Sequence, residues 1–139
     1  RSSSAWWPTS RRRPLKSLRL NLPWPPSINQ YWRAIASGGR ARNILSARGR
    51  RYREIVVIAI KAQLGDHKTT DKKVRVNILA TPPDRRRRDL DNILKPLLDG
   101  MEHGGVYEDD SQIDELRIVR KEPSRGGEVL VVVSPMRDY

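Results

Sequence analysis

The segment from Pro82 to Glu115 constrains the fold of this chain more than any other stretch. Pro82-Pro83 ends a preceding apolar run, because proline cannot donate a hydrogen bond to a sheet. Gly104-Gly105 is a stop signal for a helix that precedes it. Between these limits lie four consecutive arginines and the triplet Asp89-Leu90-Asp91. The basic block suits phosphate groups and the carboxylates suit a hard divalent cation, so the segment is a candidate site for a metal beside a nucleic-acid backbone.

The charge of the chain is distributed unevenly around this segment. The segment holds ten of the 16 Asp and Glu residues and five of the 28 Lys and Arg residues, so its charge is −5. The remainder carries +17, which makes the net charge +12. A basic body around a local acidic site is typical of an enzyme that acts on nucleic acid, because the field attracts the polyanion. The alternative is a solvated basic surface with no role in nucleic-acid binding.

Length and composition place the chain in a broad class. Its 139 residues suit one domain, which we expect to cover residues 16–139. Residues 1–15 are rich in Ser, Arg and Pro and are expected to form a flexible basic arm. The absence of cysteine excludes disulfides and thiolate metal sites and fits a reducing compartment. No apolar run approaches the roughly 18 residues of a membrane span, and the first residues lack the apolar stretch of a secretory signal, so we expect a cytoplasmic protein.

Apolar periodicity predicts six elements in the order β-α-β-α-β-β. Alternating apolar residues predict strands at residues 16–23, 74–80 and 116–121, and a continuous apolar run predicts another at 128–134. Apolar stripes of helical period predict helices at 46–64 and 92–103, with Ile55 on the buried face of the first. We therefore expect an α+β fold with a mixed four-stranded sheet and two helices mainly on one face.

Four local features refine this expectation. The loop at residues 122–127 contains two glycines and predicts that the last two strands form a hairpin. The continuous apolar run from Val129 to Val133 predicts a strand that is covered on both faces. The stretch from Ser37 to Asn43 predicts a flexible basic loop. Pro96 is tolerated only within about the first turn of a helix, so regular helix is expected to begin near Lys95.

Asp89, Asp91 and Asp110 are the candidate metal ligands. Asp89 and Asp91 follow a strand and are two residues apart, so in an extended backbone both side chains point to the same side. Asp110 belongs to a second acidic turn, Glu108-Asp109-Asp110. Oxygen ligands without Cys or a well-placed His suit Mg²⁺, with Mn²⁺ as a substitute, better than Zn²⁺. The alternatives are a helix N-cap for Asp91 and a polar turn for Asp109-Asp110.

Further residues are candidates for contacts with DNA. In an extended backbone Arg86 and Arg88 point to one side, where they can bind phosphates that flank a cut. Asn29 and Arg33 lie in a proline-rich loop that mixes polar and aromatic side chains and can bind phosphate and stack on bases. The aromatic residues of this loop are Trp24, Tyr31 and Trp32. For the two tryptophans the alternative is a place at the edge of the hydrophobic core.

Two other functions are compatible with the acidic cluster. A D-x-D pair also occurs in phosphotransferases that act on small substrates, although those with an aspartyl nucleophile usually have Thr or Val shortly after the second Asp, where this chain has Asn92-Ile93. The other alternative is a non-catalytic DNA- or RNA-binding module whose acids only cap a helix. A helix cap does not explain the four adjacent arginines, or Lys95 among apolar neighbours.

Three stretches of the chain resemble one protein family. They are LPWPPSINQYWR at residues 22–33, PPDRRRRDLDNILKPLLDGM at 82–101 and GGVYEDDSQIDELRIVRK at 104–121. Together they are similar to the RusA family of Holliday junction resolvases, and the resemblance extends from about Leu18 to Val133. It implies a homodimeric, Mg²⁺-dependent endonuclease of bacteria or phages. Such an enzyme nicks two opposed strands of a four-way DNA junction in recombination and repair.

The resemblance also implies roles for particular residues. Asp89, Asp91 and Asp110 match the three catalytic carboxylates of the family, which hold the metal. Asp110 rather than Asp109 matches the catalytic member of the paired acids. Lys95 matches the essential lysine and is expected to contact the scissile phosphate.

Overall fold

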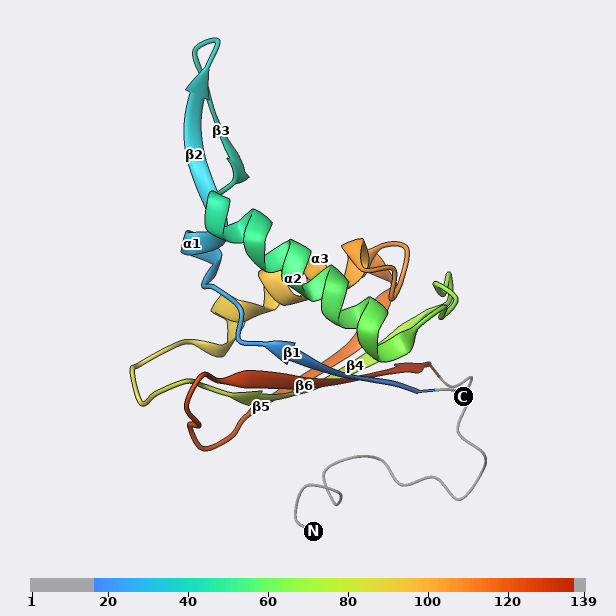
Figure 1. Ribbon diagram of the computed structural model, residues 1–139. Coiled ribbons are helices and arrows are strands. Elements are labelled where there is room, and N and C mark those ends of the chain that lie inside the picture. The colour runs from blue at the N-terminus through green and yellow to red at the C-terminus, as the bar shows by residue number, and fades with distance from the viewer. Residues whose placement is uncertain (1–16, 137–139) are drawn as a thin grey trace.

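The structure, a computed structural model, describes residues 17–136 of the chain. The arm expected at residues 1–15 lies outside this range. A four-stranded sheet with the strand order β1-β6-β4-β5 forms the base of the described part (Figure 1). Its strands are β1 (Leu18–Pro23), β4 (Val74–Thr81), β5 (Ile113–Arg120) and β6 (Glu128–Pro135). β6 pairs antiparallel with β1 and β4, whereas β4 and β5 are parallel, which confirms the expected mixed sheet.

The last two strands do not form the expected hairpin, because β4 lies between β5 and β6. The connecting loop crosses the end of β4 and bonds to it, since the amide of Lys121 donates to the carbonyl of Ala80 at 2.8 Å. Gly127 has a φ of 65° and lies so close to Pro83 that a Cβ would be 2.8 Å from the proline nitrogen. The loop therefore carries the chain across β4 and places β6 on its far side.

Two helices, α2 (Ala47–Leu64) and α3 (Leu94–His103), lie on the same face of the sheet, as expected (Figure 1). α3 begins at Leu94, so Pro96 falls in its first turn as its chemistry requires. Gly100 allows α2 and α3 to approach closely, because a Cβ there would lie 3.0 Å from a methyl group of Val56. No helix within residues 17–136 is long and apolar enough to cross a membrane.

The buried stripe of α2 is narrower than the sequence pattern predicts. Tyr52, Val56 and Ile60 are buried, but Ile55 is 45% exposed. Neighbouring residues point about 100° apart around a helix, so a helix that contacts the core along one line buries Val56 and leaves Ile55 at its margin. The placement of Ile55 on the buried face was therefore wrong.

The apolar run of β6 is not covered on both faces as predicted. Val129, Val131 and Val133 are buried, whereas Leu130 and Val132 are only half-buried. Successive side chains of a strand point to opposite faces, and the two long helices lie on one face of the sheet. A continuous apolar run here marks one covered face and one partly open face.

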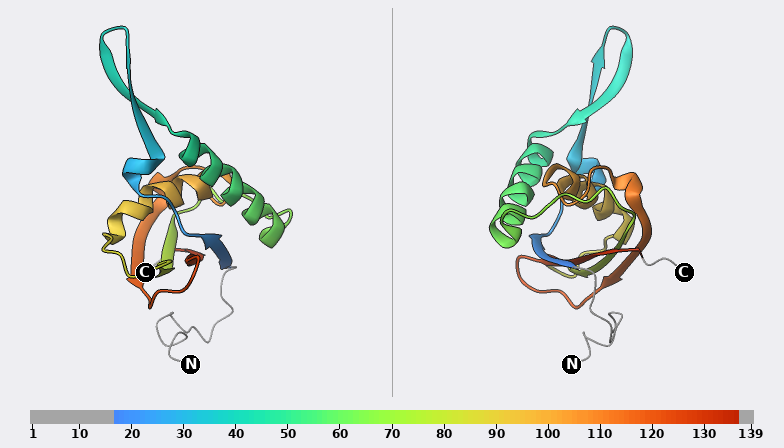
Figure 2. Two further views of the ribbon diagram at one scale, coloured as in Figure 1. Left: turned by 60° about the vertical axis from the view of Figure 1, so that its left-hand side comes forward. Right: turned by 90° about the vertical axis from the view of Figure 1, so that its right-hand side faces the viewer.

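A hairpin that the sequence pattern did not predict projects from the body. α1 (Ile28–Tyr31) leads into β2 (Trp32–Ser37) and β3 (Arg40–Leu45), an antiparallel pair that extends away from the sheet in Figures 1 and 2. Gly38 and Gly39 have φ angles of 60° and 76° and form the two-residue turn that matches the twist of such a hairpin. The flexible loop expected at residues 37–43 is therefore the end of a β-hairpin.

Candidate active site

One of the four arginines after β4 folds the loop that contains them. Arg88 turns back on the chain, and its Nη2 donates to Asp84 Oδ1 at 2.6 Å. Its guanidinium group also lies 5.8 Å from the ring centre of Trp24, a residue that packs against the core. Arg120 of β5 donates to the carbonyl of Arg88 at 2.6 Å. Arg88 therefore shapes the loop, while the other three arginines, Arg85, Arg86 and Arg87, are exposed.

Asp89 and Asp91 lie at the start of a short 3₁₀ helix, η1 (Leu90–Ile93), and both are exposed. Asp89 precedes η1, but its side chain makes no capping hydrogen bond. The N-cap position of α3 belongs to Ile93, so Asp91 is not the cap of that helix. Within residues 17–136 neither carboxylate forms a side-chain hydrogen bond or ion pair. Both are therefore available to bind a ligand.

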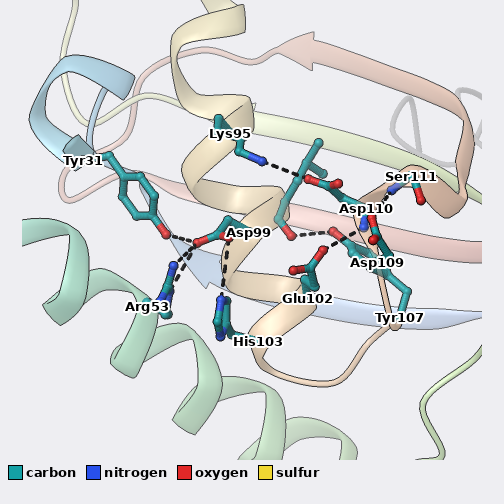
Figure 3. A network of polar contacts seen from close by, with 11 residues as sticks. Tyr31, Arg53, Lys95, Asp99, Glu102, His103, Tyr107, Asp109, Asp110 and Ser111 are labelled. Carbon is teal, nitrogen blue, oxygen red and sulfur yellow. Dashed lines mark hydrogen bonds and ion pairs between the residues drawn. The ribbon is translucent and has the colours of Figure 1, made fainter. Parts of the chain in front are cut away.

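Lys95 and Asp110, 15 residues apart in the chain, meet in space (Figure 3). Lys95 lies in the first turn of α3, and its Nζ donates to Asp110 Oδ2 at 3.1 Å. Asp110 begins a second 3₁₀ helix, η2 (Asp110–Gln112), which leads into β5. The two side chains are 45% and 31% exposed, so a substrate can reach the pair from solvent.

The two adjacent acids of this turn have different contacts. Asp109 is the N-cap of η2, and its carboxylate accepts a hydrogen bond from the amide of Ser111 at 2.8 Å. The side chain of Gln112 reciprocates by accepting from the amide of Asp109 at 2.8 Å. The bond from Ser111 lowers the pKa of Asp109. Asp109 thus stabilises the turn, whereas Asp110 faces Lys95.

The structure also groups acidic side chains that are not predicted from the sequence to lie together. Carboxylate oxygens of Glu102, Asp109 and Asp110 lie within 4.8 Å of one another. Glu102 Oε1 accepts a hydrogen bond from the amide of Asp110 at 2.8 Å, so α3 holds the turn in place. Among the described residues, Asp89 and Asp91 belong to no such group of three. The ligand set of Asp89, Asp91 and Asp110 therefore stays a prediction.

One face of α3 carries the polar contacts of the site. Lys95, Asp99 and Glu102 are spaced by four and three residues, which aligns their side chains along one side of a helix. In Figure 3, Lys95 and Glu102 meet the acidic turn, while Asp99 reaches Tyr31 and Arg53. Asp99 and Glu102 were not among the residues predicted from the sequence, where the apolar stripe and Lys95 were the features singled out in this helix. Their helical spacing from Lys95 is the signal that would have found them.

Asp99 joins three helices. It is buried, and it accepts a hydrogen bond from the hydroxyl of Tyr31 in α1 and two from Arg53 in α2, at 3.2 and 2.8 Å. Burial acts to raise the pKa of Asp99, but the bonds from Tyr31 and Arg53 lower it overall. Burial and the same carboxylate raise the pKa of Tyr31 to about 12. This clamp ties α1, and with it the β2–β3 hairpin, to the helix that carries Lys95.

Asp99→Asn should destabilise the fold by about 2–3 kcal/mol, because Arg53 loses its charged partner in a largely buried place. The pKa of Asp99 is lowered in the folded state, so its contribution is present above the ordinary Asp pKa of about 4 and is lost as the pH falls below it. The difference in free energy of unfolding between wild type and Asp99→Asn, measured by urea denaturation, should therefore be constant above about pH 4 and shrink below it.

His103→Gln is the matched control for this prediction. His103 also faces Asp99, at 3.7 Å, but its side chain is 43% exposed. Because the imidazole is exposed to solvent and the contact is long, it contributes less than about 1 kcal/mol. If His103→Gln destabilises the fold as much as Asp99→Asn, the bonds of Asp99 with Tyr31 and Arg53 are not the main source of the stabilisation.

The family model for endodeoxyribonuclease RusA matches residues 23–134 of the chain. The chain belongs to the RusA family. A protein named crossover junction endodeoxyribonuclease rusA, from Enterobacteria phage HK97, is 41% identical over 115 residues, which are 83% of this chain and 92% of that relative. RusA proteins of the same name from Enterobacteria phage 82 and Escherichia coli K12 are 35% identical over 122 residues, 88% of this chain and 98% of each relative.

The part of the chain that matches the RusA family contains every residue singled out for the site. Besides the residues of η1, α3 and the acidic turn, it includes Asn29 and Arg33, which are exposed on α1 and β2. Trp32 is half-buried and packs edge-on against Tyr31, with the ring centres 5.2 Å apart. Trp24 is also half-buried and packs partly against the core, and stacking of either tryptophan on a base stays a prediction.

Proposed function

We propose that this RusA-family protein resolves four-way DNA junctions by paired symmetric nicks, in recombination and repair, and that it depends on Mg²⁺, with Mn²⁺ as a substitute. The observation that supports this most directly is the contact of Lys95 Nζ with Asp110 Oδ2 at 3.1 Å. It joins a cation suited to a phosphate and a carboxylate suited to a metal. The relatives are named crossover junction endodeoxyribonucleases, and the four-way junction is the substrate that we propose for this chain.

The donors of the site fit a hard divalent cation. Asp89 and Asp91 are exposed and uncommitted, Asp110 is partly exposed, and the chain has no cysteine. Mg²⁺ usually keeps several waters and is bound by a few carboxylates beside a substrate phosphate. We therefore propose Asp89, Asp91 and Asp110 as its ligands. When bound, the ion would supply an activated water and neutralise charge on the scissile phosphate.

Lys95 is placed to act on the reacting phosphate. Its ammonium group is held by Asp110 and remains 45% exposed, so it can donate to a phosphate oxygen without leaving its carboxylate partner. A cation in this place stabilises the charge that develops in the pentacovalent transition state or on the leaving 3′ oxygen. Because Asp110 already orients the side chain, little reorganisation is required during the reaction.

The arginine loop and α1 would position the DNA. Arg86 is exposed and lies 3.8 Å from Asp84, a loose contact that a phosphate can replace. Arg88 is bound to Asp84 more closely and would contribute chiefly by holding the loop in shape, with 24% of its side chain still exposed to a phosphate. Asn29 and Arg33 would extend the path of the DNA beyond α1.

We propose that the protein acts as a homodimer, because the substrate has matching symmetry. An open four-way junction has equivalent strands that are related by a two-fold axis, and a two-fold dimer presents one active site to each. One cut per subunit then yields the two opposed nicks. Analytical ultracentrifugation of the free protein and of its junction complex measures this state.

The proposed function predicts junction-selective, metal-dependent cutting. The protein is incubated with a labelled four-way junction and with a linear duplex of the same sequence, in Mg²⁺, in Mn²⁺ or in EDTA. We expect paired nicks in the junction with either metal and no cutting in EDTA. Junction binding without cutting in any metal would favour a non-catalytic module. Turnover of a chromogenic phosphate ester without junction cutting would favour a phosphotransferase.

A further inference from the structure

The β2–β3 hairpin has two chemically different faces. Its register pairs Arg33 with Ile44, Ile35 with Arg42 and Ser37 with Arg40. Directly opposed residues of an antiparallel pair project to the same face, and so do alternate residues of each strand. Arg33, Arg40 and Arg42 therefore share one face, which we call the arginine face. The other face is uncharged and carries Trp32, Ala34, Ala36, Ala41, Asn43 and Leu45.

The arginine face is open and electrostatically unsatisfied. Arg33, Arg40 and Arg42 are exposed, and within residues 17–136 none of their guanidinium groups has a hydrogen bond or ion pair. The first acidic residue of the sequence is Glu54, so no carboxylate of the hairpin can neutralise them. Three cations on one face repel one another, and a bound polyanion removes that repulsion.

The base of the hairpin is fixed to the body. Ser46 directly follows β3, and its amide donates to the carbonyl of Tyr31 at 2.9 Å. Ser46 also caps α2, since its hydroxyl accepts from the amide of Gly49 at 2.9 Å. Gly49 lies so close to the carbonyl of Tyr31 that a Cβ would clash. Because the hydroxyl of Tyr31 bonds to Asp99 of α3, the hairpin is held at a defined angle to the helix that carries Lys95.

We propose that the β2–β3 hairpin binds DNA. Its arginine face would bind the phosphates of one of the four duplexes that meet at the junction, and we call the hairpin the DNA-binding arm. A two-stranded β-ribbon fits the major groove of B-DNA, and arginines on one of its faces can reach the backbone at the edge of the groove. The exposed positions of the hairpin hold no large apolar side chain, which a protein partner would be expected to use. The basic surface continues from the hairpin base into the first turns of α2 through Arg48, Arg50 and Arg51.

The arm contacts a part of the substrate that is separate from the scissile phosphate. α1, from which the hairpin departs, contacts both η1 and α3. β2 and β3 extend away from these elements in Figures 1 and 2. The arm therefore contributes to the affinity for the junction and not to the chemical step. This inference rests on the proposed function, because it takes the four-way junction as the DNA that the hairpin binds.

The first test removes two charges near the tip, in the variant Arg40→Gln/Arg42→Gln. KM for the junction should rise while kcat at saturating junction stays unchanged. Each phosphate contact contributes about 0.9 to the slope of log affinity against log salt, so the slope should become shallower by about 1.8. Between about 50 and 200 mM salt, the variant should therefore lose about tenfold less affinity than wild type. Equilibrium binding of a labelled four-way junction in EDTA measures both the affinity and the slope.

The variant Arg19→Gln/Lys61→Gln is the matched control, because it removes the same charge elsewhere. Arg19 of β1 and Lys61 in the last turn of α2 are both exposed. β1 and the end of α2 lie away from the hairpin in Figure 1. The salt slope should change by less than about half a unit, since neither residue lies on the proposed DNA path. Thermal unfolding of both double variants checks that they fold.

A second test compares the effect of a new carboxylate on junction binding when it is placed on the arginine face or on the uncharged face. Ser37 and Ala36 are neighbours and both are exposed, but Ser37 lies on the arginine face and Ala36 on the uncharged face. Ser37→Glu and Ala36→Glu change the net charge equally. Ser37→Glu places a carboxylate opposite Arg40 and should weaken junction binding at least about tenfold, whereas Ala36→Glu should weaken it less than about threefold.

Several results would contradict the proposal that the β2–β3 hairpin binds DNA. They are an unchanged salt slope for Arg40→Gln/Arg42→Gln, an equal loss of binding for the two Glu variants, and a change of oligomeric state in the double variant. The last result would assign the hairpin to contacts between subunits. If the wild-type protein binds a junction but does not cut it, the proposed function fails while the binding tests of the arm still apply.

Discussion

Replacing Asp91 by Asn should eliminate cleavage of a four-way junction while leaving the junction bound. Loss of a carboxylate weakens the proposed metal site. Metal stabilisation of the transition state is worth several kcal/mol, so kcat should fall by about 10³-fold or more. Asp91 is exposed and caps no long helix, so folding should not change. One negative charge fewer beside the DNA should preserve or raise affinity. Single-turnover cleavage in Mg²⁺ and binding in EDTA measure the two effects.

Asp109→Asn is the control for this experiment. Asp109 is an exposed aspartate that caps η2, and Asn caps a helix about as well as Asp, so cleavage should stay near normal. The same variant tests the other acidic group, because Glu102, Asp109 and Asp110 lie within 4.8 Å of one another. Normal Mg²⁺-dependent cutting by Asp91→Asn, with loss of cutting in Asp109→Asn, would place the metal in that group and reject the set we propose.

Lys95→Ala should lower kcat by about 10²–10³-fold with little change in junction affinity, because removing one preorganised donor to a transition-state charge has an effect of this size. The ion pair with Asp110 is partly exposed, so its loss should change the free energy of unfolding by less than about 1 kcal/mol. Single-turnover rates at saturating enzyme, together with the Kd of the junction, separate catalysis from binding.

Lys121→Ala is a suitable control for Lys95→Ala. Lys121 is also exposed, and it lines a hollow that Arg88 and Asp89 share. It lacks a contact with Asp110, so kcat should change by less than about threefold. If Lys95→Ala instead weakens binding in proportion to the loss of rate, Lys95 is a positioning contact for DNA and not a catalytic group.

The elements that depend on local chemistry could be predicted from the sequence. The strand at Val74–Ala80, the helix over residues 46–64 and the first-turn position of Pro96 depend only on side-chain period and on the geometry of proline, and the structure has all three. The β2–β3 hairpin was missed, because its exposed strands carry no alternating apolar pattern. The pairing of β6 with β4 instead of β5 depends on where the 121–127 loop docks, which no local pattern encodes.

The residue types of the candidate site can be read from the sequence: four arginines, a D-x-D pair, a lysine and a paired-acid turn, all on the segment between β4 and β5. The contacts that these groups make depend on the tertiary structure. It brings Asp110 to Lys95, assigns Asp109 to a cap and folds Arg88 back onto Asp84. The physical reason is that residue type sets what a side chain can bind. Which partner a side chain of this site meets depends on the packing of α3 against the turn before β5. Local sequence patterns do not predict this contact, because the two segments are apart in the chain.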